Sequence, residues 1–420
     1  MKSLWIVNKC CGAYHQKIYG KKATGGQWLD AMLDEARGCE EDRVVVVNIE
    51  KAPKMTHFQD GNISFYTLQG DPNEKYDYKS KASVRAWKSI IDKEQPDIIE
   101  IWGTEFPYAL AAMQAAPQIP CVIYVQGVLD SIAKYYLSGL SKQELKRART
   151  LRDVLTGTTV RQVQHSYQKR SAYEREIASR AGHIIIENDW ALAYYTKMCP
   201  GVKPHFLPIS ISSSFREHSW SEADMQPHTV MCPAANYPIK GLHMLLKALE
   251  IVKKEYPDVK LFVPGTAPKP TGSLKGKLKE LGYDRLIKKM IGELGLGENV
   301  MYTGRLTADE MADKMAQVNC FAMTSAIENH SSTLKEAMTV GTPCVASYVG
   351  GVPEYAVHEE NCLLYRYEDY EVLAHHICRL FEDKDLREKL SKNAIENMRK
   401  PKEKTDYEEM SAIFRRVINS

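Results

Sequence analysis

The chain has 420 residues, and its 56 Lys and Arg against 53 Asp and Glu leave a formal net charge of +3. At the usual ~150 residues per domain, this length predicts two or three domains and excludes a single small module. The 44% of hydrophobic and 26% of charged residues are typical of globular proteins and exclude a disordered chain. The near balance of charges also excludes a dedicated nucleic-acid binder, so we expect no nucleic-acid partner.

Short apolar, β-rich runs alternate with helical patterns through the first half of the chain. The expected strands are LWIVN (4–8), VVVVNI (44–49), DIIEIWG (97–103), CVIYVQG (121–127) and HIIIEND (183–189), with helices at 26–36 and 80–94. This βαβ rhythm predicts parallel strands with helical crossovers, which make an open α/β sheet. Ligands of such sheets bind beyond the carboxyl ends of the strands, so the loops after the strands are the candidate site.

The rhythm restarts after the Pro- and Ser-rich segment 206–215, which we interpret as a linker. The expected strands are 228–234, 259–265, 298–304, 320–325 and 343–347, and the expected helices are 241–255, 274–294, 307–317, 332–340, 369–382, 385–398 and 405–418. We therefore predict an N-terminal α/β domain at 1–210 and a second one at 211–398, with a cleft between them. The final segment, 399–420, is expected to pack back on the first domain.

Neither an export signal nor a membrane span is predicted. The apolar run at 4–7 is shorter than the ~7–15-residue core of a signal peptide. The uncharged stretch 106–129 could span a bilayer in length, but prolines and glutamines interrupt it. The ten cysteines include no zinc-type spacing, and Cys121, Cys320 and Cys344 lie in apolar runs typical of buried thiols. We therefore expect a cytoplasmic protein.

Residues 142–180 are rich in Lys and Arg, and periodic apolar positions such as Leu145, Leu151 and Val154 make their helices amphipathic. An anionic lipid headgroup or a lipid-linked phosphate would fit such a surface. This interpretation predicts peripheral association with the inner face of the cell membrane. A solvated helical face explains the same pattern, and the sequence leaves both interpretations open.

Three short motifs resemble nucleotide or metal sites but stand in the wrong context. GELGLG at 292–297 has its glycines in the wrong order for a dinucleotide loop, and GKL at 276–278 lacks the rest of a phosphate-binding loop. Asp383-Lys384-Asp385 resembles a metal-binding pair, but it joins two charged helices, where we expect Asp385 to be an N-cap. We therefore predict neither a metal nor a cofactor.

The most informative stretch is 320–354, which reads CFAMTSAIENHSSTLKEAMTVGTPCVASYVGGVPE. After an expected strand, a loop holds Glu328, and a helix begins at 331–333 and carries Glu336 in its early turns. The amide groups and the positive end of a helix favour a phosphate, and small hydroxyl side chains allow its close approach. Ionised carboxylates accept hydrogen bonds from sugar hydroxyls. One such site could hold a sugar, a diphosphate and a ribose.

Glu328 and Glu336 form an E-x7-E pattern, and the segment GTPCVASYVGGVPE (341–354) follows them. Together they resemble the retaining glycosyltransferases of family 4 (group 1), whose segment reads G-x-P-V-V-A-S-x-x-G-G-x-P-E. The resemblance implies the GT-B fold, in which two Rossmann-like, doubly wound parallel-sheet domains face a central cleft. It also implies that Glu328 orients the transferred sugar and that Glu336 holds the donor ribose.

Further positions extend the resemblance over most of the chain. Lys240, after the first strand of the second domain, corresponds to the lysine that the family places on the donor diphosphate. Arg305 follows a strand-end glycine and is either a phosphate contact or a solvated residue. Gly25 and Gly26 resemble the family's N-terminal glycine loop near the phosphate and acceptor, or form an ordinary turn. Gln126, at the end of a first-domain strand, is expected on the acceptor side.

The loop between the two glutamates departs from the family pattern. Residues 329–332 stand where the family often has glycines, so we expect Ser331, Ser332 and Thr333 to add hydroxyl donors to the amide groups around the phosphate. His330 is expected to contact the donor phosphate or the acceptor.

Two further departures concern charge. Residues 234–236, Ala-Ala-Asn, replace the diphosphate-binding arginine that the family commonly carries before the lysine, and Arg305 is the candidate substitute. Gln126 replaces a histidine that often ends this strand, and glutamine does not titrate, which excludes proton transfer by a histidine there.

The resemblance implies a metal-independent, retaining glycosyltransferase. It would move a sugar from a nucleotide-diphosphate sugar, which is a substrate and not a cofactor, to a glycan or lipid-linked acceptor in surface polysaccharide biosynthesis. Two alternatives stay open: a GT-B sugar-nucleotide epimerase or phosphorylase, and a catalytically degenerate sugar-nucleotide-binding subunit. The replaced arginine and Gln126 suit the degenerate subunit, while the presence of Lys240, Glu328 and Glu336 together favours an enzyme.

Overall fold

The computed structural model describes residues 1–8, 12–19, 27–50, 55–70, 79–208, 211–233, 235–268 and 280–420. The chain divides into two compact units. The first comprises Met1–Leu129, Gln168–Ser210 and Lys402–Ser420, and the second comprises Asp130–Tyr167 and Ile211–Pro401. The predicted extent of the first domain, 1–210, is therefore wrong in one part, because Asp130–Tyr167 belongs to the second unit.

Buried hydrogen bonds explain why this segment belongs to the second unit. The carbonyl oxygen of Ser138 accepts one from Nε2 of His243 at 2.8 Å and another from the hydroxyl of Tyr367 at 2.9 Å. Glu144 forms an ion pair with Lys247 at 2.8 Å. All three partners lie far along the sequence, so the local pattern of the segment does not reveal its attachment.

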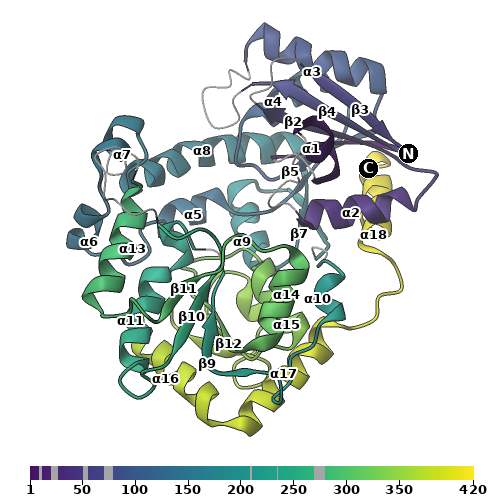
Figure 1. Ribbon diagram of the computed structural model, residues 1–420. Coiled ribbons are helices and arrows are strands. Elements are labelled where there is room, and N and C mark those ends of the chain that lie inside the picture. The colour runs from purple at the N-terminus through teal and green to yellow at the C-terminus, as the bar shows by residue number, and fades with distance from the viewer. Residues whose placement is uncertain are drawn as a thin grey trace. The chain divides into compact units, whose positions relative to one another are not determined.

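The first unit is built on one sheet (Figure 1). Its elements are β1 (Lys2–Ile6), α1 (Gly12–Tyr19), α2 (Gln27–Arg37), β2 (Arg43–Glu50), β3 (Thr56–Asp60), β4 (Ile63–Gln69), α3 (Lys81–Glu94), β5 (Ile98–Trp102), α4 (Tyr108–Ala115), β6 (Cys121–Tyr124), most of α8 (Val160–Ala181), β7 (His183–Ile186), α9 (Asp189–Met198), β8 (Lys203–Phe206) and α18 (Asp406–Ile418). The strand order is β3-β4-β2-β1-β5-β6-β7-β8, with every described pair parallel except β3 and β4. The parallel sheet confirms the βαβ prediction.

Helices cover both faces of this sheet. Successive side chains of a strand point to opposite faces, so a strand can contribute to two buried clusters. In β1, Leu4 and Ile6 belong to a buried cluster with α3, α4, α8 and α9. Trp5 and Val7 belong to a second cluster, with α2 and α18. Because residues 4–7 are all buried, on one face or the other, they appear in the sequence as a continuous apolar run.

The C-terminal helix α18 is held against the first unit by a buried carboxylate. Asp42 is 3% exposed and accepts a hydrogen bond from the hydroxyl of Ser411 at 2.6 Å. It also pairs with Arg415 at 3.0 Å and with the terminal amino group of Met1 at 3.3 Å. One carboxylate thus ties both ends of the chain to the same sheet.

The second unit has its own sheet. Its elements are α5 (Leu129–Tyr135), α6 (Lys142–Arg147), α7 (Leu151–Thr156), α10 (Ser214–Glu217), β9 (Gln226–Met231), η1 (Pro238–Lys240), α11 (Leu242–Val252), β10 (Lys260–Val263), α13 (Gly282–Glu293), β11 (Val300–Tyr302), α14 (Ala308–Gln317), β12 (Val318–Met323), α15 (Ser332–Val340), β13 (Cys344–Ser347), η2 (Val352–Glu354), β14 (Leu363–Tyr365), α16 (Tyr370–Glu382) and α17 (Lys384–Met398). The described strands are all parallel, in the order β11-β10-β9-β12-β13-β14.

This order, 3-2-1-4-5-6 along the second half of the chain, is that of a Rossmann-like fold and confirms the predicted doubly wound sheet. In Figure 1, α11 and α13 lie on one side of the strands and α14 and α15 on the other. The chain changes direction between β9 and β12, so the loops after these two neighbouring strands diverge there.

The structure bears on the predicted burial of three cysteines and on the search for membrane-spanning helices. Cys121, Cys320 and Cys344 are buried free thiols, as predicted. Within the described ranges, none of the helices combines the length and the apolar character that a membrane span requires.

Candidate active site

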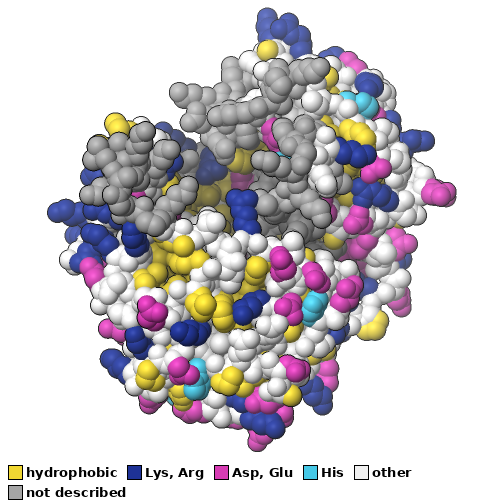
Figure 2. All heavy atoms as spheres, in the orientation of Figure 1, with side chains coloured by type: hydrophobic (Ala, Val, Ile, Leu, Met, Phe, Trp, Pro, Cys, Tyr) yellow, Lys and Arg dark blue, Asp and Glu magenta, His cyan; other side chains and the backbone are white. Residues whose placement is uncertain are grey.

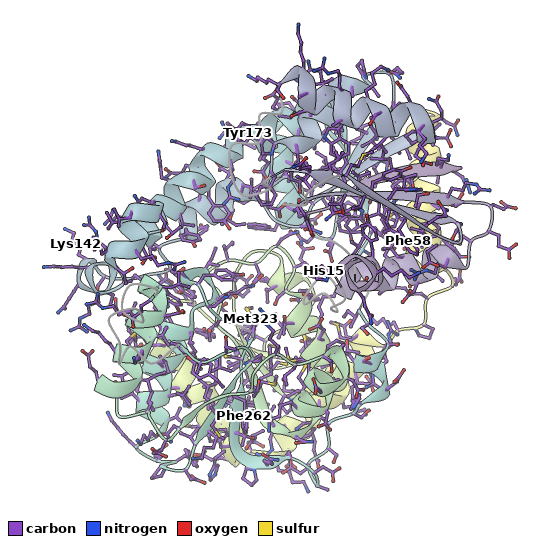
Figure 3. The ribbon with its side chains drawn as sticks, turned by 45° about the horizontal axis from the view of Figure 1, so that its top comes forward. His15, Phe58, Lys142, Tyr173, Phe262 and Met323 are labelled. Carbon is purple, nitrogen blue, oxygen red and sulfur yellow. The ribbon has the colours of Figure 1, made fainter. Side chains whose placement is uncertain are left out.

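The candidate site lies where β9 and β12 are neighbours in the second sheet. The loop after β9 ends in the 3₁₀ helix η1, whose last residue is Lys240. The loop after β12 carries Glu328, and Figure 3 labels Met323, the strand's last residue, from which this loop departs. In open α/β sheets this change of direction is where ligands bind.

The structure brings together Lys240 and Glu328, which are 88 positions apart in sequence. The Nζ of Lys240 donates to Oε1 of Glu328 at 2.6 Å, and their side chains are 23% and 13% exposed. The hydroxyl of Ser325 donates to the same oxygen at 2.5 Å. Burial alone would lower the pKa of Lys240, but the carboxylate of Glu328 outweighs burial and holds that pKa above its usual value. The lysine therefore stays charged at neutral pH.

Backbone contacts hold the two loops together. The hydroxyl of Thr324 donates to the carbonyl of Lys240 at 3.1 Å, and the amide of Ala326 donates to the carbonyl of Ile239 at 2.8 Å. Gly241 follows with a φ of +70°, and a Cβ there would lie 1.6 Å from the carbonyl oxygen of Thr324. Only glycine permits this approach, which places Lys240 beside the loop after β12.

We expect Gly241→Ala to lower the free energy of unfolding by about 3 kcal/mol or more, because it adds a backbone clash to the strain of a positive φ. Gly295→Ala is the matched control, since its φ is +66° but nothing lies within 4 Å of its added Cβ. The control should cost only about 1 kcal/mol. Urea denaturation measures both variants, and equal losses would contradict the close approach at Gly241.

The helix α15 begins and ends where the sequence predicts. Ser331 is its N-cap, and the side-chain oxygen accepts a backbone amide hydrogen bond at 3.4 Å. Gly341 ends it with a φ of +86°. Ser332 and Thr333 are partly exposed at the first two helical positions. The positive end of the helix, which favours an anion, therefore directly follows the loop of Glu328.

The GGVPE segment contacts the backbone of Glu328 and helps to fix its position. The amide of Gly351 donates to the carbonyl oxygen of Glu328 at 3.2 Å. A Cβ on Gly350 would lie 1.7 Å from that oxygen, and the φ of Gly350 is +55°. The hydroxyl of Ser347 donates to the carbonyl of Ser325 at 2.6 Å. The segment that carries the family resemblance therefore positions the backbone around Glu328.

Glu336 lies on the second turn of α15 and is only partly exposed. Burial raises the pKa of its carboxyl group to about 7. The group therefore changes its protonation state near neutral pH, where it can switch from a hydrogen-bond donor to an acceptor of two or more hydroxyl groups.

An aromatic ring that the sequence analysis did not single out lies beside the helix N-terminus. The ring of His330 meets that of Tyr355 edge-on at 4.7 Å, and the hydroxyl of Tyr355 donates to the carbonyl of Ser331 at 3.4 Å. Lys335 is 7% exposed, and its Nζ lies 6.0 Å from the centre of the same ring. Tyr355 directly follows the GGVPE motif, and that position is the only sequence signal for it.

The other predicted site residues lie elsewhere. Arg305 is exposed after β11, an outer strand two positions from β9, which at the usual spacing separates the strands by about 10 Å. Its substitution for the family arginine stays a prediction. Gln126 is partly buried after β6 in the first unit. Gly25 and Gly26 lie outside the residues that the structure describes.

The first sheet changes direction between β1 and β5, and polar residues that the sequence analysis missed follow both strands. Nδ2 of Asn8 donates to Oε2 of Glu105 at 2.5 Å, and the hydroxyl of Tyr108 donates to Oδ1 of Asn8. Gly103 has a φ of +84°, and a Cβ there would lie 2.2 Å from Oε2 of Glu105. The available signal was that Asn8 ends the expected strand 4–8 and that Glu105 closely follows the expected strand 97–103.

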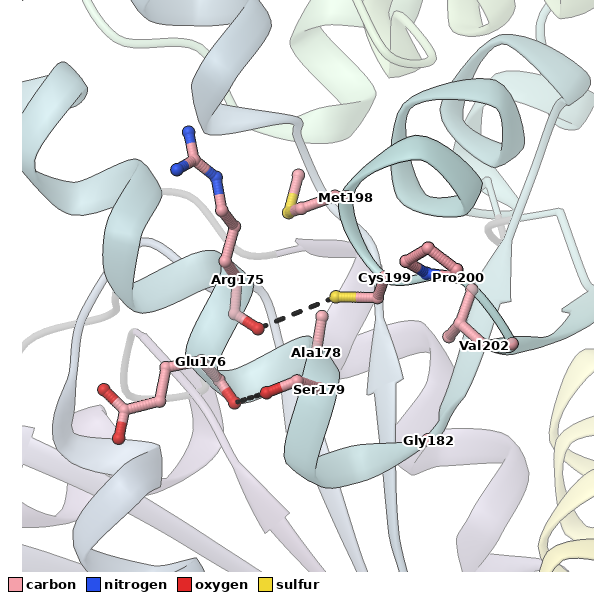
Figure 4. A pocket seen from close by; sticks show the side chains of 10 residues that line it. Arg175, Glu176, Ala178, Ser179, Gly182, Met198, Cys199, Pro200 and Val202 are labelled. Atoms are coloured by element: carbon pink, nitrogen blue, oxygen red, sulfur yellow. Dashed lines mark hydrogen bonds between the residues drawn. The ribbon is translucent and has the colours of Figure 1, made fainter.

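A cavity of about 530 Å³ lies in the first unit, between the end of α8 and the connection from α9 to β8 (Figure 4). On its wall, the thiol of Cys199 donates to the carbonyl of Arg175 at 3.7 Å, and the hydroxyl of Ser179 donates to the carbonyl of Glu176 at 3.0 Å. None of the predicted site residues lines this cavity, so it is separate from the candidate site.

No metal site emerges from the part of the chain that the structure describes, where no group of three or more His, Cys, Asp or Glu side chains could hold an ion. The carboxylate of Asp383 accepts a hydrogen bond from the amide of Leu386 at 2.9 Å and caps α17. The N-cap is therefore Asp383, and the prediction of Asp385 is wrong by two residues.

Residues 215–397 match the family described as glycosyl transferases group 1. The match covers less than half of the chain and lies within its second unit, which is similar over this range to the group 1 glycosyl transferases. Lys240, Glu328, α15 and the GGVPE segment all lie inside the matched range. The candidate site therefore lies in the part of the chain that matches this family.

Curated relatives match shorter stretches. A GDP-mannose-dependent alpha-(1-6)-phosphatidylinositol monomannoside mannosyltransferase of Mycolicibacterium smegmatis is 29% identical over 132 residues, which are 30% of this chain and 31% of the relative. The enzyme of the same description from Mycobacterium tuberculosis is 23% identical over 201 residues, which are 44% and 49%. The chain therefore spans less than half the length of either relative.

Solved structures match the whole chain. Sucrose-phosphate synthase from Thermosynechococcus elongatus superposes with a TM-score of 0.74 at 19% identity, over 100% of this chain and 99% of that one. Anabaena HepE in complex with UDP and glucose gives 0.67 at 17% identity, over 99% and 100%. These likenesses confirm the predicted GT-B fold with two Rossmann-like domains.

Proposed function

We propose that this protein is a group 1 glycosyl transferase, namely a retaining enzyme of family 4. It transfers a sugar from a nucleotide-diphosphate sugar to a hydroxyl of a glycan or lipid-linked acceptor in surface polysaccharide biosynthesis. The names of the mannosyltransferase relatives support a nucleotide-sugar donor and a lipid-linked acceptor, and the UDP complex of HepE supports the donor. We propose a cytoplasmic location, where such donors are made, with the basic segment 142–180 meeting the membrane.

The pair of Lys240 and Glu328 carries this proposal. Its atoms are 2.6 Å apart, and it lies between two diverging loops next to the N-terminus of α15. In a nucleotide-sugar, the transferred sugar is bonded directly to the diphosphate. A donor whose sugar hydroxyls bind Glu328 therefore brings its diphosphate to Lys240 and to the helix end.

The proposed mechanism is mainly electrostatic. As the bond between sugar and diphosphate breaks, negative charge grows on the leaving oxygen, where Lys240 and the amides and hydroxyls of Ser331, Ser332 and Thr333 stabilise it. The acceptor hydroxyl attacks on the face that the diphosphate leaves, and its proton passes to the leaving oxygen. No protein nucleophile, metal or cofactor takes part in this proposal, and Arg305 is an additional candidate for the diphosphate.

The acceptor side is proposed to involve the first unit. Gly25, Gly26 and Gln126 keep their expected roles there as proposals. The hydrogen-bonded pair of Asn8 and Glu105 adds a carboxylate at the corresponding strand ends, which suits the binding of an acceptor hydroxyl.

The stereochemistry of the product tests the proposal. We expect the anomeric configuration of the donor sugar in the product, as determined by proton NMR. Inversion would exclude a retaining enzyme, release of free nucleotide with an epimerised sugar would favour the epimerase, and a requirement for inorganic phosphate would favour the phosphorylase. Donor binding without any turnover would favour the degenerate subunit.

The raised pKa of Glu336 predicts a pH dependence of donor affinity. Because the ribose diol donates hydrogen bonds, it binds the ionised carboxylate, so affinity should rise about tenfold between pH 6 and pH 8 as the group with a pKa of about 7 ionises. Glu336→Gln should flatten this profile, whereas Glu360→Gln, at an exposed site, should not. Titration calorimetry with the nucleotide-sugar measures all three, and identical profiles would contradict a role for Glu336.

The same shift has a consequence for stability. The folded-state pKa of Glu336 lies above the ordinary value of 4.5, so folding binds a proton between these values. The unliganded protein therefore loses stability as the pH rises from about 4.5 through about 7. Glu336→Gln should remove that part of the loss.

A further inference from the structure

The segment Asp130–Tyr167 belongs to the second unit and carries exposed basic side chains. Arg147 pairs with Glu293 of α13 at 2.8 Å, and the hydroxyl of Thr150 donates to the carbonyl of Glu280 at 3.2 Å. These contacts add to the buried bonds of Ser138 described above. Figure 3 shows Lys142 at the outer end of this segment.

Both acidic residues between 142 and 162 are engaged inside the unit, whereas the same stretch contains six Lys and Arg. Burial would raise the pKa of Glu144, but its ion pair with Lys247 and the hydrogen bonds from Ser141 outweigh burial and lower the pKa to about 2. Asp153 is 1% exposed and accepts a hydrogen bond from Thr150 at 2.7 Å. Neither acid therefore pairs with the exposed cations Lys142, Lys146, Arg149 and Arg161.

A groove of about 410 Å³ concentrates this charge around an apolar floor. The groove is lined by Lys142, Leu145, Lys146, Arg149, Val154, Thr159, Val160, Arg161 and Gln162. Its four cations are exposed, and none of them forms an ion pair within the described ranges of the chain. Figure 2 shows Lys and Arg side chains gathered around α6. A phosphate-bearing headgroup fits such a ring of cations.

Two leucines on α7 are exposed next to this groove. Leu151 is 65% and Leu155 is 77% exposed, and they are four residues apart, so they lie on the same face of the helix. A soluble polyanion such as a nucleic acid or an acidic glycan would use the cations but leave both leucines in water. A lipid surface takes up both, because apolar side chains enter the interface while cations bind the headgroups.

We propose that α6, α7 and the first turns of α8 dock on an anionic lipid membrane, with a headgroup phosphate in the groove and Leu151 and Leu155 in the interface. This inference rests on the proposed function in one respect: if the acceptor is lipid-linked, the transfer reaction takes place at a membrane. The proposed docking surface is shorter than the segment 142–180 that the sequence predicted, because residues from Gln168 to Arg180 belong to the first unit. Within that unit, Arg180 pairs with Glu176 at 2.6 Å. In this proposal, the unit that contains Lys240 and Glu328 is the one that binds the membrane.

Co-sedimentation of the full chain with phosphatidylcholine vesicles, with and without phosphatidylglycerol, tests this proposal. We expect binding only to the anionic vesicles and its release by salt. The double variant Lys146→Gln, Arg149→Gln should bind about 30-fold more weakly, and Leu151→Ser, Leu155→Ser at least tenfold more weakly. Controls on α16 and α17, namely the charge-matched Lys384→Gln with Lys392→Gln and the apolar-to-polar change Val372→Ser, should bind as the unchanged protein does.

Failure of the unchanged chain to bind anionic vesicles would overturn the proposal. Loss of binding in the cation variant but not in the leucine variant would also overturn it, since the groove would then be a site for soluble anions. Because the four altered side chains are exposed, melting temperatures should stay unchanged and serve as the folding check. Nucleotide-sugar binding by the same variants reports separately on the proposed enzymatic function.

Discussion

Glu328→Gln is expected to lower release of nucleoside diphosphate from the donor by about 100- to 1,000-fold. The amide keeps the size of the side chain and can still accept the hydrogen bond from Ser325, but it loses the charge that orients the sugar hydroxyls and pairs with Lys240. Steady-state kinetics with a nucleotide-sugar found by ligand screening measures the effect. The fold should be kept, as circular dichroism can check.

Glu144→Gln is the matched control for this change. Its carboxylate is 15% exposed against 13% for Glu328, and each pairs with a lysine of the same unit within 2.8 Å. The control breaks an equally buried ion pair away from the site, so it should cost similar stability and leave donor turnover unchanged. Equal turnover in the two variants would show that the loss is structural and not chemical.

Lys240→Ala is expected to reduce turnover by a similar factor, about 100- to 1,000-fold, for a different reason. The ammonium group stabilises the diphosphate more as charge grows on the leaving oxygen, so kcat should fall more than donor affinity. Measurement of kcat and of the donor dissociation constant separates the two effects. A change in affinity alone would mean that Lys240 binds the donor without assisting departure of the diphosphate.

Lys247→Ala controls for the stability cost of this variant. Lys247 is 25% exposed and pairs with Glu144, as Lys240 is 23% exposed and pairs with Glu328. Both variants leave a partly buried carboxylate without its cation, so their unfolding free energies should fall alike. Turnover should fall only in Lys240→Ala, and a comparable fall in Lys247→Ala would argue against a specific role of Lys240.

Local patterns predicted much of the fold and of the site's framework. Alternation of apolar runs with helices predicted both parallel sheets, because central strands such as β5 and β12 are buried along their whole length. The capping residues Ser331 and Gly341 marked the ends of α15 correctly. The family resemblance placed Lys240 and Glu328 around the same donor, but their ion pair was not predicted, since no local pattern links residues 88 positions apart.

The features that were not predicted depend on contacts between distant segments or on turn signals that were not recognised. The hairpin of β3 and β4 was not predicted, although Asp60 and Gly61 at its turn are a known hairpin signal. The attachment of Asp130–Tyr167 to the second unit depends on His243 and Tyr367. The hydrogen bonds of these two side chains form only in the folded protein, so the local sequence does not reveal them.

A thermal-shift screen of nucleotide-sugars tests the central claim most directly. At 100 times its dissociation constant, the true donor should stabilise the folded protein by ~2.7 kcal/mol, and the shift should be much smaller in Glu336→Gln and Lys240→Ala than in Lys247→Ala. This pattern would establish that a nucleotide-sugar binds at α15 and Lys240. The absence of a shift with every nucleotide-sugar, or equal shifts in all variants, would contradict the account.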